Sequence, residues 1–192
     1  MEFVVMPDNR LPQEVDGTLA PDVLSAYDDD FDFANNKFYL VSQDHCPGRV
    51  VYWTKDAYAE IPMRIDNIGH IDLPVSVDGK PMQATLDTGS SRSLMSLEAA
   101  EDLFGFNEKD SSLKPLSSSN EHWHPYRYPF KSLAFEGVIV NNPDLVLISN
   151  DESKMMGSGS PKIILGMGVL RQLHLYIAYH EHKLYVTPAT AH

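Results

Sequence analysis

Short runs of apolar and β-branched residues, each ended by Gly, Pro, Asn or Asp, recur along the whole chain of 192 residues. Runs of this kind are typical of β-strands and the turns between them. We expect strands at residues 2–6, 37–42, 49–53, 59–65, 70–77, 82–87, 133–140, 144–149, 175–179 and 183–187. Asp78-Gly79 lies between two of these runs and predicts a tight hairpin. Since strands do not alternate regularly with long helices, the pattern favours an all-β fold over a parallel α/β fold.

Three segments indicate short helices. The clearest is SLEAAEDLFG, in which Ser96 is suited to cap the first turn and Gly105 to end the last. Residues 21–27 and 168–173 carry shorter helical patterns. The expected fold is therefore a sheet structure with one or two short helices in its main domain.

The chain contains an internal repeat. Residues 19–41 align without a gap with residues 165–187, at a constant offset of 146 (Leu19 to Leu165). Identical residues are Leu19, Val23, Leu24, Lys37 and Tyr39 with Leu165, Val169, Leu170, Lys183 and Tyr185. Both copies read as a small turn, a short helix and two strands. We therefore expect residues 1–45 to be the end of a first repeat, residues 46–58 a linker, and residues 59–188 a complete second repeat. Ala20 departs from the pattern, because Gly166 holds that place in the second copy.

The segment ATLDTGSSRSLMS, from Ala84 to Ser96, contains the candidate functional residues of the chain. An apolar strand ends in Asp87-Thr88-Gly89-Ser90, and Gly89 permits a tight turn beside the carboxylate. A second apolar strand with a glycine follows downstream in IILGMGVL, residues 163–170. An Asp-Thr-Gly tripeptide alone occurs by chance in many turns. Here it lies between a predicted strand and a predicted helix, with a second apolar strand downstream, and this combination is a specific signal.

With these two motifs, residues 59–188 resemble the retropepsin-like aspartic proteases, including the soluble bacterial members. The resemblance implies a closed β-barrel lobe of the acid-protease type, preceded by a partial repeat of the same fold. It implies that Asp87 is catalytic, that Thr88 braces two catalytic loops and that Ser90 donates a hydrogen bond to the carboxylate. Further support for the catalytic loop would come from Gly89 and, in a ψ-shaped core behind it, from Ile164, Leu165 and Gly166.

The implied activity is that of an aspartic endopeptidase acting on extended polypeptides, with no cofactor and with activity at mildly acidic pH. Such an enzyme activates water between two carboxyl groups, one ionised and one protonated. The sequence holds one Asp-Thr-Gly. The second aspartate would come either from a second copy in a symmetric homodimer or from a lobe upstream in a longer protein. A flap over the substrate is implied near residues 117–128, with Trp123 and Tyr126 as candidates for contact.

A different class of function stays open, in which the same fold is a non-catalytic dimerisation or peptide-binding module. A metal site is not expected, because His180 and His182 lie in a predicted turn and His122 and His124 lack a third ligand. YDDDFDF, residues 27–33, predicts a solvated strand face. The lone Cys46 excludes an intrachain disulfide.

Composition and the chain start exclude several partners. A net charge of −12 without a basic cluster argues against nucleic-acid binding. No apolar run is long enough for a membrane span, and the first residues show no secretion signal. The resemblance nevertheless implies a periplasmic or secreted protein.

Overall fold

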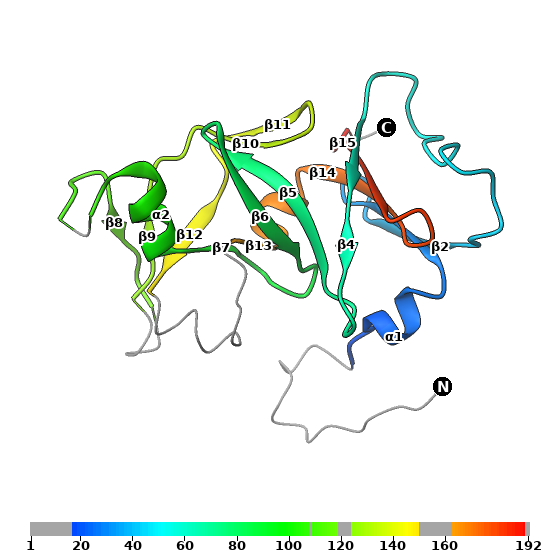
Figure 1. Cartoon of the computed structure of the whole chain (residues 1–192), viewed down its shortest axis with the longest axis horizontal. Helices are drawn as coiled ribbons and strands as arrows, with labels where there is room; N and C mark the ends of the chain where they lie inside the picture. The colour runs from blue at the N-terminus through cyan, green and yellow to red at the C-terminus, as the bar shows by residue number, and fades with distance from the viewer. Residues whose placement is uncertain (1–16, 108, 119–123, 150–162, 191–192) are drawn as a thin grey trace.

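The computed structural model of the chain describes residues 17–107, 109–118, 124–149 and 163–190 (Figure 1). Its strands form two sheets, and the described helices are short: α1 (Pro21–Leu24), α2 (Leu97–Phe104) and α4 (Met167–Leu170). The expected all-β fold with few helices is confirmed. Figure 1 shows the larger sheet curling through the left and centre of the molecule and the smaller sheet at the right.

The larger sheet carries the Asp87-Thr88-Gly89 motif. Its strands are β4 (Arg64–Ile65), β5 (Ile71–Val77), β6 (Lys80–Leu86), β7 (Ser93–Ser96), β8 (Lys114–Pro115), β9 (Tyr126–Arg127), β10 (Ser132–Phe135), β11 (Val138–Asn141), β12 (Leu145–Ile148) and β13 (Ile163–Leu165). They are ordered β11-β10-β5-β6-β13-β7-β12-β9-β8, with β4 beside β5. Along β5, buried and half-buried residues alternate, so one face of the strand packs into the main core.

The smaller sheet joins the two ends of the described chain. It contains β1 (Asp28–Asp32), β2 (Lys37–Val41), β3 (Ala59–Pro62), β14 (Leu173–Ala178) and β15 (Lys183–Pro188). The order is β2-β1-β14-β15-β3, and every pair is antiparallel. Residues 28–41 are thus hydrogen-bonded to the C-terminal hairpin. The domain limits at residues 45 and 58 stay a prediction.

Local sequence signals are confirmed where they are strong. The Ser96 hydroxyl accepts a hydrogen bond from the Ala99 N–H at 3.3 Å, and Gly105 ends α2 with a left-handed φ of 73°. Asp78 and Gly79 join β5 to β6 with φ values of 45° and 77°, which two-residue hairpins of type I′ require. These signals need only neighbouring residues, which explains why the sequence predicts them.

Three strand predictions are wrong. Residues 59–65 form two strands, β3 and β4, which belong to different sheets. Residues 133–140 form a hairpin rather than one strand, because Glu136 and Gly137 turn the chain with φ values of 37° and 112°. Residues 49–53 form no strand; they lie in an irregular segment where Val50 packs against the outer face of the smaller sheet. The predicted strand at residues 2–6 lies outside the described residues.

The prediction of a solvated face at residues 27–33 is also wrong. The side chains of Asp28, Asp29 and Asp30 are 0 % exposed. Strand β1 lies between β2 and β14, so both of its edges are paired. Buried carboxylates require hydrogen-bond partners, and these come from far along the chain. His45 contacts Asp28 at 2.6 Å and His174 contacts Asp30 at 2.7 Å.

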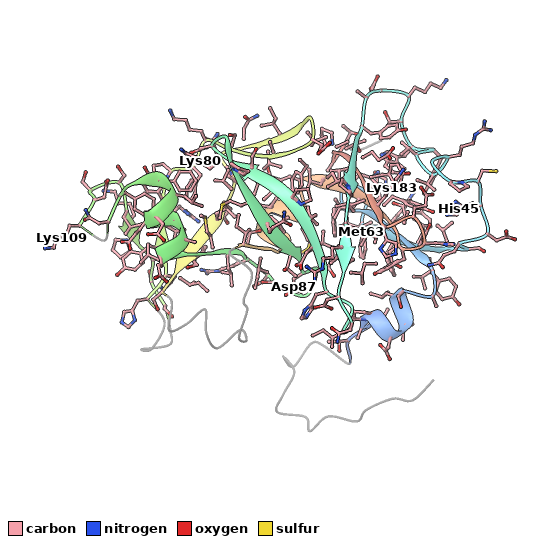
Figure 2. All side chains as sticks on the ribbon, in the orientation of Figure 1. His45, Met63, Lys80, Asp87, Lys109 and Lys183 are labelled. Carbon is pink, nitrogen blue, oxygen red and sulfur yellow. The ribbon has the colours of Figure 1, made fainter. Side chains whose placement is uncertain are left out.

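The segment that precedes β3 covers the outer face of the smaller sheet. We call residues 42–58 the covering segment; it includes the predicted linker. Tyr52 donates a hydrogen bond to Asp30, and the Trp53 indole donates one to Thr187 at 3.0 Å. The Trp53 ring also stacks on His174 at 4.2 Å between centroids. His45, in the same segment, lies at the far right of Figure 2.

Candidate active site

Asp87 lies directly after the end of β6, at the lower centre of Figure 2. Its backbone N–H donates to the Leu165 carbonyl at 2.9 Å, which ties the loop to β13. The carboxylate accepts a hydrogen bond from the Gly89 N–H at 2.9 Å, and the Ser90 N–H donates to the Asp87 carbonyl at 3.2 Å. The Asp87 side chain is exposed. The loop therefore presents a fixed carboxylate to solvent at the end of a buried strand.

Strand β13 supports this loop from behind, where the sequence places Ile164, Leu165 and Gly166. It inserts between β6 and β7, with Leu165 opposite Leu86 in a parallel pair. A Cβ atom at Gly166 would lie 2.2 Å from the Arg92 carbonyl oxygen and 2.6 Å from that of Ser90. Only a residue without a side chain fits this approach. The Met167 N–H then donates to the Ser90 carbonyl at 2.8 Å.

The predicted bond from Ser90 to the Asp87 carboxylate is wrong for this structure. The Ser90 hydroxyl donates to the Arg92 carbonyl at 2.7 Å, because the loop turns that carbonyl towards it. Sequence reasoning also missed Ser93. Its buried hydroxyl donates to the Gly166 carbonyl at 2.9 Å and accepts from the Gly166 N–H at 3.1 Å. The signal for Ser93 was a hydroxyl residue at the head of an apolar strand.

A cavity of about 620 Å³ lies beside the Asp87 loop. Its lining includes Asp87, Thr88 and Gly89, together with Asp29 and Tyr179. Asp29 is fully buried, and its Oδ2 accepts a hydrogen bond from the Tyr179 hydroxyl at 3.1 Å. Its Oδ1 has no hydrogen-bond partner among the described residues. Nothing in the sequence predicts that the Asp29 carboxyl lines the same cavity as Asp87.

Burial, together with the neighbouring charge of Asp28, raises the pKa of Asp29 to about 7, although the Tyr179 hydrogen bond lowers it. The ordinary pKa of an aspartate is 3.8. Between pH 3.8 and about pH 7, Asp29 is therefore protonated in the folded chain and ionised in the unfolded chain. The free energy of unfolding therefore falls as pH rises from about 4 to about 7. The hydrogen bond to Asp28 also raises the pKa of His45 above its usual value of 6.5. The stability that this pair contributes is therefore lost as pH rises above that value.

The substitution Asp29→Asn is expected to reduce this pH dependence. Asn keeps an acceptor for Tyr179 but cannot ionise. The difference in unfolding free energy between pH 4 and pH 8 should shrink by about 3 kcal/mol, below the ceiling of about 4 kcal/mol set by the pKa shift. Urea unfolding at both pH values measures it. Asp102→Asn, at an exposed position of α2, is the control and should leave the difference unchanged. An unaltered pH dependence in Asp29→Asn would show that Asp29 titrates normally.

The remaining predicted site residues are placed as follows. Tyr126 lies in β9 opposite Leu147, half-buried against the main core. Trp123 lies outside the described residues, so its role in a flap stays a prediction. His180 and His182 are exposed in the turn between β14 and β15, as expected. Within the described ranges, no group of three or more His, Cys, Asp or Glu side chains is arranged to hold a metal ion.

The structural comparisons returned solved structures of low sequence identity. A retropepsin-like aspartic protease from Rickettsia conorii is 20 % identical over 68 % of this chain and 89 % of its own, with a TM-score of 0.47. The retroviral protease-like domain of Ddi1 from Leishmania major is 14 % identical over 63 % and 96 %, with a TM-score of 0.43. Basic 7S globulin from soybean is 7 % identical over 86 % of this chain and 50 % of its own, with a TM-score of 0.48.

The sequence comparisons identify the family. No curated protein sequence matches the chain. Among the described residues, no helix has the length and apolar character needed to cross a membrane. A family model described as aspartyl protease matches residues 73–169, which is just over half of the chain. This match contains Asp87, its loop and the supporting strand β13, and it confirms the resemblance inferred from the two motifs. The chain belongs to the aspartyl protease family.

Proposed function

We propose that this protein is part of an aspartic endopeptidase, in which Asp87 supplies one of two catalytic carboxyl groups. The observation that carries the proposal is the geometry of the loop. Asp87 is exposed, its carboxylate accepts the Gly89 N–H, and β13 fixes the loop through the close approach of Gly166. Such fixation holds a reactive group in place before substrate arrives.

The proposed reaction is hydrolysis of a peptide bond by water. An ionised carboxylate takes a proton from the water as its oxygen attacks the carbonyl carbon, and the protonated partner carboxyl donates a hydrogen bond to the carbonyl oxygen. Collapse of the tetrahedral intermediate breaks the C–N bond, and the amine nitrogen leaves with a proton from the pair. Two adjacent carboxyls suit this chemistry because they cannot both ionise easily.

The substrate would be an extended polypeptide segment with apolar residues around the cleaved bond. Extended segments are recognised by main-chain hydrogen bonds, with alternate side chains in pockets. The segment at residues 117–128 is the proposed flap. The partner aspartate belongs either to a second copy of the chain or to an upstream lobe. The proposed location of the protein is the periplasm or the outside of the cell.

A second function has an observation in its favour. The sequence contains one Asp-Thr-Gly, and the other carboxyl lining the cavity, Asp29, is buried in a strand rather than presented on a loop. A lobe that never meets a second catalytic aspartate would bind peptides or other lobes without cleaving them.

One experiment distinguishes these functions. Light scattering gives the mass of the chain in solution, and a casein or peptide cleavage assay is run on the same fractions from pH 4 to about 7, the range in which a carboxyl pair shares a proton. We expect cleavage only from fractions that contain a partner for Asp87. Binding of peptide without cleavage in every assembled form would favour the non-catalytic module.

A further inference from the structure

The two ends of the described chain repeat each other in structure. Shifted by the offset of 146 residues, helix α1 falls on α4, β1 falls within β14 and β2 falls within β15. The hairpin registers also agree. Asp28 pairs with Val41 in the first hairpin, and the equivalent residues His174 and Thr187 pair in the second.

The pairing between the two hairpins is symmetric as well. Asp30 lies opposite Tyr176, which is its own equivalent in the repeat. The flanking pairs, Asp29 with Ile177 and Phe31 with Leu175, exchange with each other under the same offset. A local twofold axis therefore passes between Asp30 and Tyr176. Strand β1 already fills the place on the edge of β14 that a twofold-related β14 would occupy.

The two halves differ in what covers them. The outer edge of β15 pairs with β3, whereas β2 has no strand on its outer edge among the described residues. As a result Phe38, Tyr39 and Leu40 are 41 %, 41 % and 44 % exposed, while the equivalent residues of β15 are buried. Leu19 is 60 % exposed, but its equivalent Leu165 is fully buried. Helix α4 buries three residues and α1 buries none.

These uncovered groups adjoin the candidate active site. Leu19, Ala20 and Pro21 line the same cavity as Asp29 and the Asp87 loop. The Oδ1 of Asp29 is fully buried in this region and has no hydrogen-bond partner among the described residues. A buried oxygen of this kind normally has a hydrogen-bond partner. Among the described residues, the first half therefore lacks the outer strand and the core that the second half receives from residues 59–188.

We propose that the surface formed by β2 and α1, beside the cavity that Asp29 lines, docks a second lobe that is homologous to residues 59–188 and precedes this one on the same polypeptide. A strand of that lobe pairs with β2 as β3 pairs with β15, and the lobe brings its own catalytic aspartate opposite Asp87. The inference rests on the proposed function only for the catalytic role of that second aspartate; the docking follows from the repeat.

A second copy of this chain does not meet these requirements. Each copy carries its own β1–β2 hairpin on its own β14, so the twofold position beside β14 is filled in both. The proposed lobe does not need that position, because residues 17–41 already supply its terminal hairpin beside β14. Ala20 in place of Gly166 indicates that the loop of the second lobe lies slightly farther from this segment than the Asp87 loop lies from Gly166.

The predicted register identifies which backbone groups take part. In the second half, the Met63 N–H donates to the His182 carbonyl, and Lys183 lies opposite Pro62, which has no N–H. The backbone groups of Leu184 and Val186 therefore point towards β3. By equivalence, the N–H groups of Phe38 and Leu40 point to the uncovered edge of β2.

The test uses a peptide of residues 57–65, AYAEIPMRI, as a probe for the missing strand, with the full chain of 192 residues as its target. Hydrogen exchange is measured for the Phe38 and Leu40 amides at peptide concentrations up to about 1 mM, since one short strand is expected to bind weakly. We expect about tenfold slower exchange at these two amides. Light scattering on the same samples should show a monomer.

Two variants sharpen the test. Leu40→Pro removes an N–H that faces only the uncovered edge, a position at which an edge strand tolerates proline, so it should lose the protection while circular dichroism stays unchanged. Asp87→Asn should bind the peptide like the original chain, so binding succeeds or fails independently of catalysis. The proposal is overturned if the peptide protects neither amide, if both are already protected in the monomer, or if the chain forms a dimer that protects them without peptide.

Discussion

Replacing Asp87 by Asn is expected to lower kcat/KM for peptide cleavage by at least about a thousandfold in the assembly that holds both carboxyl groups. Asn has nearly the same shape as Asp but cannot ionise, so it cannot take a proton from water or share one with a partner carboxyl. The loop should remain intact, because the Asn side-chain oxygen can still accept the Gly89 N–H that now donates to Asp87 at 2.9 Å.

The measurement is steady-state cleavage of a peptide across pH 4 to about 7, with urea unfolding in parallel to show that the loop remains folded. Asp102→Asn is the matched control, because it makes the same chemical change at an exposed position of α2. It should leave both activity and stability unchanged. Cleavage by Asp87→Asn at the original rate would remove Asp87 from the mechanism and favour the non-catalytic reading of the fold.

The substitution Gly166→Ala is expected to lower the free energy of unfolding by about 5 kcal/mol, a loss large enough to unfold many single-domain proteins. The added Cβ would lie 2.2 Å and 2.6 Å from the carbonyl oxygens of Arg92 and Ser90. Both are backbone atoms, so no side-chain rotation relieves the contact, and β13 must move away from the loop. That movement would break the hydrogen bonds that join Ser93 to Gly166 and Met167 to Ser90.

Urea unfolding of Gly166→Ala measures this loss. Gly17→Ala is the control, because an added Cβ there has nothing within 4 Å. Its stability should change by less than about 0.5 kcal/mol. If Gly166→Ala remained within about 1 kcal/mol of the original chain, β13 would not be packed against the loop as closely as the structure has it.

Helix α2 and the hairpin at Asp78-Gly79 show what the sequence by itself determined. Each depends on residues close together in the chain: a serine before the first turn, a glycine with left-handed φ after the last, and a two-residue turn between strands. The Asp87 loop and its supporting strand were recognisable because their residue types are tied to one arrangement. Position 166 requires glycine because two backbone segments approach each other closely there.

The burial of Asp28, Asp29 and Asp30 was decided only by the tertiary structure. Alternating acidic and aromatic residues predict a solvated strand, and nothing nearby in the sequence contradicts this. Their partners His45, His174 and Tyr179 lie from 17 to 151 residues away, and sequence alone does not show that these groups meet. The same holds for the Ser90 hydroxyl, which is directed to a carbonyl by the path of the loop. Local rules determine elements, whereas the environment of a charged side chain depends on which distant strands become its neighbours.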